Sequence, residues 1–307
     1  MSNVKGRGPK GFANPTALPE TSEQARHWQE ANRSWWENHP MRYDWKEKIT
    51  FPEFTKEFYV EIDRRFFSNV WEYMPWNKQS FDYLIDFDSL FDKDVLEIGA
   101  GNGSHAQLLA RYARSFTGID ITDYAVRSTS ERMRYFGLEA TILRMDAEEM
   151  QFADNTFDFI WAWGVIHHSS NTRRVLQEMH RVLKPGGQAI TMVYHRNLWS
   201  YYIMCGLLRG VLQGDLLRTR SFHATVQQST DGAIARFYSL AEWESLVSTL
   251  FYVERIMVFG SKAELIPLPG SKVKKVLMRL IPNGLSRFLM NRCKMGSFLV
   301  SVLKKIA

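Results

Sequence analysis

Cysteine is scarce in this chain, and no metal-binding pattern is present. The two cysteines, Cys205 and Cys293, lie far apart and match no metal-ligand spacing. Zinc chemistry is therefore not expected, and no metal ligand is predicted. A reducing, cytoplasmic setting is the simplest interpretation of so little cysteine.

Long hydrophobic runs are also missing from the 307 residues. None is long enough and free enough of charge to span a bilayer as a helix. The first nineteen residues (1–19) are rich in glycine, proline and lysine and lack the apolar core of a signal peptide. We expect residues 1–19 to be disordered.

Acidic residues are absent after Glu264, although basic residues continue to the end of the chain. Such asymmetry favours an anionic partner surface. Within residues 272–294, apolar residues recur at helical spacing, with lysine and arginine on the other faces. Two short basic amphipathic helices could lie on an anionic bilayer as a peripheral attachment. The alternative is a helical hairpin packed on the core with a solvated basic rim.

Short apolar segments alternate with helical segments through the middle of the chain. This alternation predicts an α/β fold, a parallel sheet covered by helices on both faces. Residues 20–92 read as a helical preface, with helices expected over 23–38 and 54–73. The expected strands are 95–98, 115–119, 140–144, 157–163 and 188–194, and the expected helices between them are 105–112, 125–136 and 172–182.

The most informative motif is the run from Asp94 to Gly103. An apolar strand carries Glu97, and glycines follow at positions 99, 101 and 103. A turn without side chains at a strand tip lets the backbone approach a bound nucleoside closely. Asp120 ends the next apolar strand, where a carboxylate can accept hydrogen bonds from both hydroxyls of a ribose.

The glycine spacing differs from the G-x-G-x-x-G of dinucleotide-binding enzymes. It resembles motif I of class I S-adenosylmethionine (SAM)-dependent methyltransferases. Asp146-Ala147 resembles the pair that binds adenine in that family, and 157–164 resembles its motif IV. The run Gly164-Val165-Ile166-His167-His168, followed by a helix and a Lys-Pro-Gly-Gly turn at 184–187, is typical of the group that includes the ubiquinone and menaquinone C-methyltransferases.

The resemblance implies a seven-stranded Rossmann-like methyltransferase sheet, mostly parallel with an antiparallel last strand at 296–305. The methyltransferase domain would cover 93–307, with a helix at 240–251, a strand at 252–259 and insertions at about 196–236 and 261–295. Insertions at strand ends are where such folds build substrate sites.

The resemblance also implies SAM as cofactor. Asp120 would bind the ribose, Asp146 and the Ala147 amide the adenine, and Glu97 would act through backbone or water near the methionine end. An aromatic residue of the preface, Tyr43, is a candidate to cover the sulfonium, or else to anchor the preface to the core. The full set of expected cofactor residues is Glu97, Gly99, Ala100, Gly101, Gly103, Asp120, Ile121, Asp146, Ala147, Trp163 and Tyr43.

Two histidines follow the fourth strand, where the transferred methyl should lie. His167 or His168 is a candidate general base for a hydroxyl or an enolisable carbon, and the other is expected to be structural. Tyr194 and His195, at the tip of the fifth strand, are further candidates.

Motif IV lacks the Asn/Asp-Pro-Pro-Tyr/Phe signature of amino-group and many nucleic-acid methyltransferases. The sequence therefore predicts methyl transfer to an oxygen or a carbon of a small-molecule or lipid-like acceptor. Alternatives are an RNA or protein methyltransferase that uses the basic C-terminal region, and a non-catalytic SAM-binding regulator. No recognisable RNA-binding module accompanies the basic charge, which disfavours nucleic acid.

Overall fold

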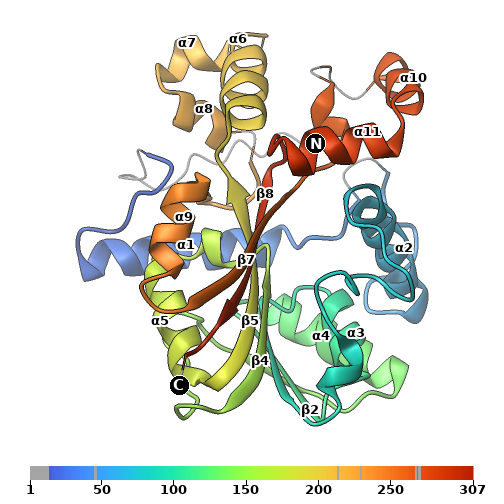
Figure 1. The fold of residues 1–307 in the computed structure, drawn as a ribbon, viewed down its shortest axis with the longest axis vertical. Helices are drawn as coiled ribbons and strands as arrows, with labels where there is room; N and C mark the ends of the chain where they lie inside the picture. Colours follow the sequence, from blue (N-terminus) through green and yellow to red (C-terminus); the bar gives the residue numbers. More distant parts are fainter. Residues whose placement is uncertain are drawn as a thin grey trace.

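A twisted sheet crosses the middle of the computed structural model, which describes residues 14–44, 47–212, 214–228, 230–266, 268 and 271–306 (Figure 1). Its strands follow the order β3-β2-β1-β4-β5-β8-β7, and the two-residue strand β6 pairs with the end of β5. The strand bounds are β1 Asp94–Ile98, β2 Ser115–Asp120, β3 Thr141–Arg144, β4 Phe157–Trp163, β5 Leu183–His195, β6 Phe237–Tyr238, β7 Tyr252–Phe259 and β8 Phe298–Lys304.

The pairing confirms the expected fold. The pairs from β3 to β5 are parallel, and β8 runs antiparallel to both β5 and β7. This is the expected Rossmann-like sheet, mostly parallel with antiparallel pairs at the β8 end. Because parallel strands are covered on both faces, the central strands read as apolar runs rather than as alternating ones.

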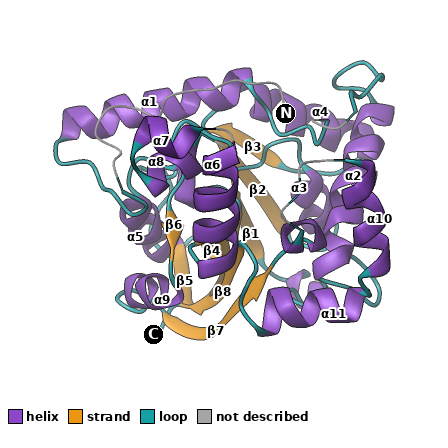
Figure 2. Ribbon diagram, turned by 90° about the horizontal axis from the view of Figure 1, so that it is seen from above, coloured by secondary structure: helices purple, strands orange, loops and turns teal. Residues whose placement is uncertain are grey.

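Two buried clusters occupy the two faces of the sheet. On one face, Leu96 and Ile160 pack with residues of α5 (Thr172–Val182) and α9 (Leu240–Val247). On the other face, Val95 and Phe159 pack with residues of α3 (Ser104–Ala110), α4 (Asp123–Phe136) and the preface. Figure 2 shows the helices on either side of the orange strands. The sheet is therefore the shared wall of both cores.

The preface forms helices α1 (Ser22–Asn38) and α2 (Lys56–Tyr73), close to the expected ranges. It also forms the short η1 (Phe87–Leu90), which was not expected. The side chains of Thr21 and Thr55 accept hydrogen bonds from backbone amides in the first turns of α1 and α2 and so cap them. Both helices contact helices that cover the sheet, so the preface is not a separate unit.

The expectation of disorder over 1–19 was wrong for residues 14–19; residues 1–13 lie outside the described residues. The carbonyl oxygen of Pro15 accepts from Phe237 N at 2.9 Å. The carbonyl oxygen of Ala17 accepts from Nε of Arg236 at 2.7 Å. Arg236 is fully buried, so its guanidinium requires acceptors, and its other nitrogens donate to the carbonyls of Ser169 and Ser170.

The Lys-Pro-Gly-Gly segment was expected as a turn, but it lies within β5, which begins at Leu183. The pairing of β4 with β5 shifts register between Phe157 and Phe159, and Gly186 has a φ of +77°. The four residues thus form a bulge inside the strand. Gly186 N donates to the carbonyl of Lys305 at 2.8 Å, and Lys305 N donates to the carbonyl of Gly187 at 3.0 Å.

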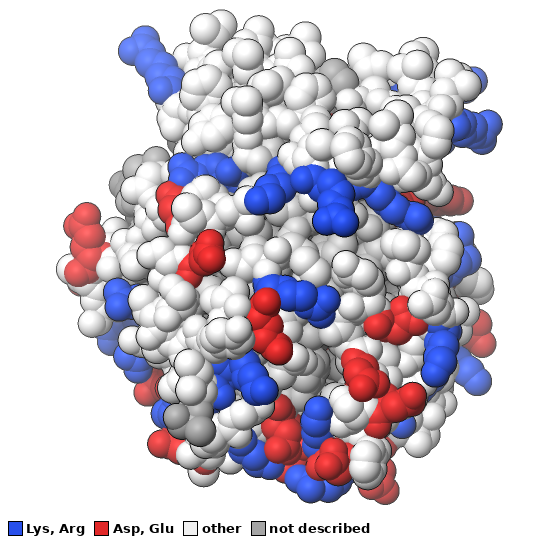
Figure 3. All heavy atoms as spheres, viewed as in Figure 1, with Lys and Arg blue, Asp and Glu red and all other residues white. Residues whose placement is uncertain are grey.

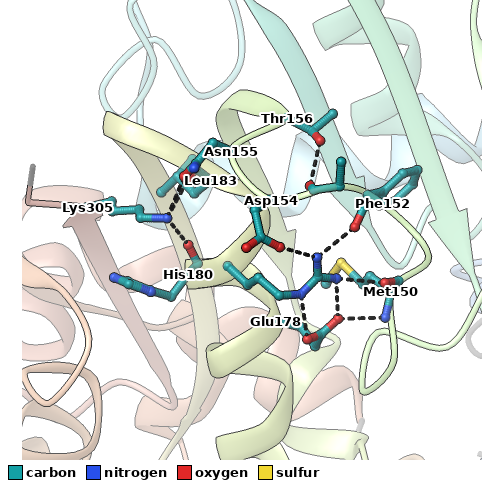
Figure 4. Close-up of polar contacts among 11 residues, drawn as sticks. Met150, Phe152, Asp154, Asn155, Thr156, Glu178, His180, Leu183 and Lys305 are labelled. Carbon is teal, nitrogen blue, oxygen red and sulfur yellow. Dashed lines mark hydrogen bonds and ion pairs between the residues drawn. The ribbon is translucent and has the colours of Figure 1, made fainter.

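The edge of the sheet where the parallel strands begin is held by two basic side chains (Figure 4). Arg181 donates to the carbonyls of Met150 and Phe152 at 2.7 and 2.6 Å. Lys305 Nζ donates to the carbonyls of His180 and Leu183 at 2.7 and 2.8 Å. These contacts close the end of the sheet opposite to the two insertions.

Both insertions lie beyond the end of β5, at the top of Figure 1. The first contains the π-helical segment η3 (Leu198–Arg209), α6 (Gly210–Leu212), α7 (Asp215–Thr219) and α8 (Phe222–Gln227). The second contains η4 (Lys262–Leu265), α10 (Lys272–Leu280), α11 (Asn283–Arg287) and η5 (Phe288–Arg292). Among the described residues, no helix has the length and apolarity needed to cross a bilayer.

One fully buried cation joins the preface to the core. The guanidinium of Arg132, on α4, pairs with Asp63 of α2. It also donates to Gln107 Oε1 at 2.7 Å and to the carbonyl of Asn102 at 2.8 Å. The side chain thus connects α2, α3, α4 and the glycine loop through a single charged group.

We expect Asp63→Ala to lower the free energy of unfolding by about 3 kcal/mol, because it leaves the Arg132 charge buried without its counter-ion. Glu30→Ala, which removes the exposed pair with Arg33, is the control and should cost less than about 1 kcal/mol. Urea unfolding followed by circular dichroism measures both. Equal losses for the two variants would contradict the assignment of Arg132 as a structural hub.

Candidate functional site

A cavity of about 470 Å³ opens at the carboxyl ends of β1, β2 and β4. Residues of the preface helices α1 and α2 and of the loop between them complete its walls. This edge of an open parallel sheet is where ligands bind in α/β folds. The cavity is the site around which the candidate residues can be placed.

The glycine loop forms one wall of the cavity, and its backbone explains the alternate spacing. Gly99, Gly101 and Gly103 have φ values of +80°, +55° and +77°, a region that side chains disfavour. A Cβ on Gly99 would lie 2.7 Å from a methyl carbon of Val165. Gly99, Ala100, Gly101 and Gly103 all line the cavity, as the sequence predicts.

Asp120 lies beside this loop at the end of β2. Its Oδ2 accepts from Gly101 N at 3.1 Å, and its Oδ1 accepts from the amide and hydroxyl of Thr122 at 3.0 and 2.8 Å. Burial raises the pKa of Asp120 from its usual value, and these hydrogen bonds counteract that rise. Asp120 and the following Ile121 both line the cavity, and the carboxylate is fixed in orientation.

Asp146 and Ala147 line the cavity after β3. Asp146 Oδ1 accepts from Glu148 N and from Gln29 Nε2, both at 2.8 Å. Gln29 Oε1 in turn accepts from Ser170 N at 2.9 Å. Gln29 therefore connects α1 to both loops at this end of the cavity.

Helix α1 contributes side chains to the cavity that no sequence motif indicates. Gln29, Asn32 and Trp36 all line the cavity, and Asn32 Oδ1 is buried without a hydrogen-bond partner among the described residues. Their i, i+3, i+7 spacing puts them on one face of the helix. That spacing, in a helix of otherwise polar character, is the signal from which they could have been found.

Glu97 is buried and lies behind the cavity wall rather than in it. Its Oε1 is 3.5 Å from Nδ1 of His105, which does line the cavity. Burial raises the pKa of Glu97 well above its usual value and lowers the pKa of His105 to about 3. Both groups therefore favour their neutral forms. His105, which no sequence motif indicates, lies between Glu97 and the cavity.

Two predicted aromatic residues reach the cavity. Trp163 lines it and stacks on the fully buried Trp161, with ring centroids 5.1 Å apart. Tyr43 lines it as well and packs on Phe66 of α2 at 5.1 Å. Tyr43 is therefore part of the cavity wall and packs within the preface.

The two histidines after β4 have different environments. His167 is fully buried with its ring 4.0 Å from that of Tyr194, and it lies behind the cavity wall. His168 lines the cavity, and its Nδ1 is 2.7 Å from the carbonyl oxygen of Ile234. Because a carbonyl only accepts, Nδ1 carries the proton in the neutral ring and Nε2 has the lone pair. Burial lowers the pKa of His168, which favours that neutral form.

A second polar group faces the cavity from the end of the first insertion. Tyr194 Oη donates to Asp231 Oδ1 at 2.7 Å, and both residues line the cavity. Asp231 lies in a region with no motif, so no sequence pattern points to it. His195 points elsewhere and has its Nδ1 2.8 Å from the carbonyl oxygen of Gly296.

The remaining wall is mostly apolar. Phe66, Val70 and Tyr73 from α2 face Met192 of β5 and Phe298 of β8. The cavity thus has a polar end, formed by the glycine loop, Asp120 and Asp146, and an apolar end beside His168 and Tyr194.

Residues 96–191 match the family model described as "Methyltransferase domain". Over 97 residues the chain is 37% identical to a phthiotriol/phenolphthiotriol dimycocerosates methyltransferase of Mycobacterium tuberculosis, covering 31% of this chain and 35% of that protein. It is 27% identical over 161 residues to a ubiquinone biosynthesis O-methyltransferase of Pseudomonas aeruginosa, covering 52% of this chain and 69% of that protein. The chain spans about a third of the length of the first of these relatives.

Among solved structures, the [4+2]-cyclase SpnF aligns with 96% of this chain and 99% of its own, at a TM-score of 0.50 and 15% identity. At that identity the likeness supports the fold alone. Residues 96–191 are thus similar to a methyltransferase domain, and the chain shares its fold with SpnF.

We expect Asp120→Ala to weaken SAM binding at least about tenfold, because hydrogen bonds to a charged carboxylate contribute about 1.5–3 kcal/mol. Isothermal titration calorimetry with SAM measures the change. Asp123→Ala, which removes a largely exposed carboxylate three residues away, is the matched control and should bind normally. Unchanged affinity in Asp120→Ala would contradict the ribose assignment.

Proposed function

We propose that this chain, whose residues 96–191 form a methyltransferase domain, transfers a methyl group from SAM to an oxygen or carbon of a small-molecule or lipid-like acceptor. The observation that carries the proposal is the division of one cavity into two ends. The polar end suits the cofactor, and the apolar end beside it contains a neutral histidine.

The residues of the polar end fit the cofactor. Asp120 would accept the ribose hydroxyls, Asp146 and the Ala147 amide would bind the adenine, and the glycine loop and His105 would face the methionine end. The cofactor supplies a methyl group already activated on a sulfonium. The chain's own contribution is therefore alignment of the acceptor and a dry site.

His168 is the residue we propose as general base. Its Nδ1–H is directed to the Ile234 carbonyl, so Nε2 is left to take a proton from the acceptor. The lowered pKa keeps the ring neutral at pH 7. The Asp231 carboxylate, which accepts from Tyr194, would favour the imidazolium that forms. His167 lies behind the cavity wall, so we assign it the structural role.

The acceptor class follows from the apolar end. Phe66, Val70, Tyr73 and Phe298 suit an apolar or aromatic body better than a nucleotide or a peptide backbone. Names among the relatives support this direction, since they include a dimycocerosates methyltransferase, a ubiquinone biosynthesis O-methyltransferase and a sterol 24-C-methyltransferase. One relative is a glycine/sarcosine/dimethylglycine N-methyltransferase, so the names alone do not select the acceptor atom.

The test is a screen with methyl-labelled SAM against lipid extracts, phenols and quinols, read by mass spectrometry. We expect a labelled product in the organic-soluble fraction. Label in RNA or protein instead would support the alternative that uses the basic C-terminal region. SAM binding without any labelled product would support the non-catalytic regulator.

We expect His168→Asn to lower kcat by about 10²-fold or more while SAM affinity stays unchanged, because it removes the base and not a cofactor contact. In the unaltered chain, the neutral ring is the active form and its pKa is lowered. The rate should therefore be flat near pH 7 and fall only below the usual histidine range, about pH 6.5.

The matched control is His180→Asn, because His180 lies at the opposite edge of the sheet beside Phe251. It should keep full activity. A rate that rises through pH 8, or full activity in His168→Asn, would remove His168 from the mechanism.

A further inference from the structure

The helices of the two insertions form a surface that we call the cap: η3 and α6–α8 on one side, α10, α11 and η5 on the other. More than half of the large hydrophobic side chains exposed in the described residues lie in the two insertions. In the cap these are Leu198, Tyr202, Leu207, Val211, Leu212, Leu217 and Phe222 from the first, and Val273, Val276, Leu277, Leu280, Leu285 and Phe288 from the second. So much exposed apolar surface at one end of a chain indicates an interaction site.

Helix α10 shows that this surface lacks a partner within the described part of the chain. None of its residues is buried, and Leu280 is 72% exposed. The helix is held instead from its carboxyl end, where Lys262 Nζ donates to the carbonyls of Met278 and Ile281 at 3.2 and 2.6 Å. The expected packing of this hairpin on the core is therefore absent for α10, whose apolar face points outward.

The rest of the second insertion is anchored firmly. Arg287 donates to the carbonyls of Trp71 and Glu72, both at 3.1 Å, and Asn291 Nδ2 donates to the carbonyl of Tyr73 at 2.9 Å. These contacts attach α11 and η5 to the end of α2. The cap is thus presented on a fixed base, and its exposure does not arise from a detached segment.

The acidic side chains of the two insertions bond within the protein, whereas several of the basic ones are exposed. The two insertions contain three acidic residues, and each is engaged inward. Asp215 is buried and pairs with Arg218 at 2.6 Å, Asp231 accepts from Tyr194, and Glu264 accepts from the amides of Ser261 and Ser297 at 2.8 and 3.1 Å.

Several basic side chains of the insertions are exposed, whereas Arg236 is buried and Lys262 and Arg287 bond to backbone carbonyls. Lys272, Lys275, Arg279, Arg292 and Lys294 are all exposed. Figure 3 shows the upper part of the molecule as mostly uncharged, with lysine and arginine side chains at its edges and in a row where it meets the body. The outward face of the cap is therefore apolar and positively charged.

We infer that the cap is a two-part docking surface for an anionic phospholipid bilayer. Its aliphatic side chains would enter the boundary between headgroups and acyl chains, and its lysines and arginines would meet the lipid phosphates. Both insertions contribute apolar residues, so both sides of the cap touch the bilayer. This extends the sequence expectation, which considered residues 272–294 alone.

Two features favour a bilayer over other anionic or apolar partners. A nucleic acid would leave the exposed leucines and valines in water, because single strands stack on aromatic rings rather than on aliphatic chains. A second copy of this chain would bring the same basic residues face to face in a symmetric interface, where they repel.

The cap also adjoins the cavity. Asp231, from the first insertion, and Ser261, where the second begins, both line it. Docking would therefore place the cavity beside the bilayer, from which a lipid-like acceptor could enter; this last step rests on the proposed function, whereas docking itself does not.

The test is co-sedimentation of the full chain with vesicles of phosphatidylcholine alone or mixed with phosphatidylglycerol, without SAM or acceptor. We expect strong binding to the mixed vesicles, weaker binding to phosphatidylcholine, and loss with added salt. Leu212→Glu/Leu217→Glu in the first insertion and Val276→Glu/Leu280→Glu in the second should each lower the partition coefficient about tenfold or more. Lys272→Glu/Lys275→Glu should lower it on the mixed vesicles only.

The matched control is Phe91→Glu/Ile306→Glu, because these exposed residues lie at the opposite edge of the sheet. It should bind like the unaltered chain, and thermal melts confirm that each variant is folded. Absence of vesicle binding, or sensitivity in one insertion only, overturns the two-part surface. So does salt-sensitive binding to RNA without vesicle binding, or a dimer in size-exclusion chromatography that Leu212→Glu/Leu217→Glu separates.

Discussion

The buried guanidinium of Arg132 is the constraint on which the site depends. It neutralises Asp63 on α2 and bonds to the carbonyl of Asn102 in the glycine loop, so the preface and the loop share one charged group. A buried cation must have its hydrogen bonds satisfied, and here α2, α3 and the glycine loop supply the acceptors. The loop's conformation and the position of the preface are therefore fixed together.

That coupling gives the cavity its two ends. With α2 held against the sheet, Phe66 and Tyr73 face β5 and β8. With the loop held, the Gly101 amide donates to Asp120. Burial then sets the protonation of the side chains around the cavity, favouring neutral His105 and His168. Under the proposed function, a largely apolar chamber beside a polar cofactor pocket would suit methyl transfer, because SAM carries the reactive charge itself.

The two insertions extend the protein at the end of the sheet where the cavity opens. They leave the sheet at neighbouring points, supply Asp231 and Ser261 to the cavity, and then turn their apolar side chains away from the core. Their three acidic groups are engaged inward, so positive charge and aliphatic surface remain outside. The same two segments thus contribute to the cavity and form the cap.

The sequence by itself determined the sheet, the glycine loop, Asp120, Asp146 and the histidine pair, because each depends on residues close in the chain: apolar runs, positive-φ glycines and polar residues at strand tips. It located α1, α2 and the hairpin near 272–294 for the same reason. Only the tertiary structure decided which further side chains reach the cavity, namely Gln29, Asn32, His105 and Asp231, and that His168 rather than His167 faces it. It also decided that Arg236 orders residues 14–19 and that α10 is left uncovered. These outcomes depend on contacts between distant segments. Whether a side chain lies in the core, in the cavity or in solvent depends on what packs beside it, and the local sequence pattern does not contain that information.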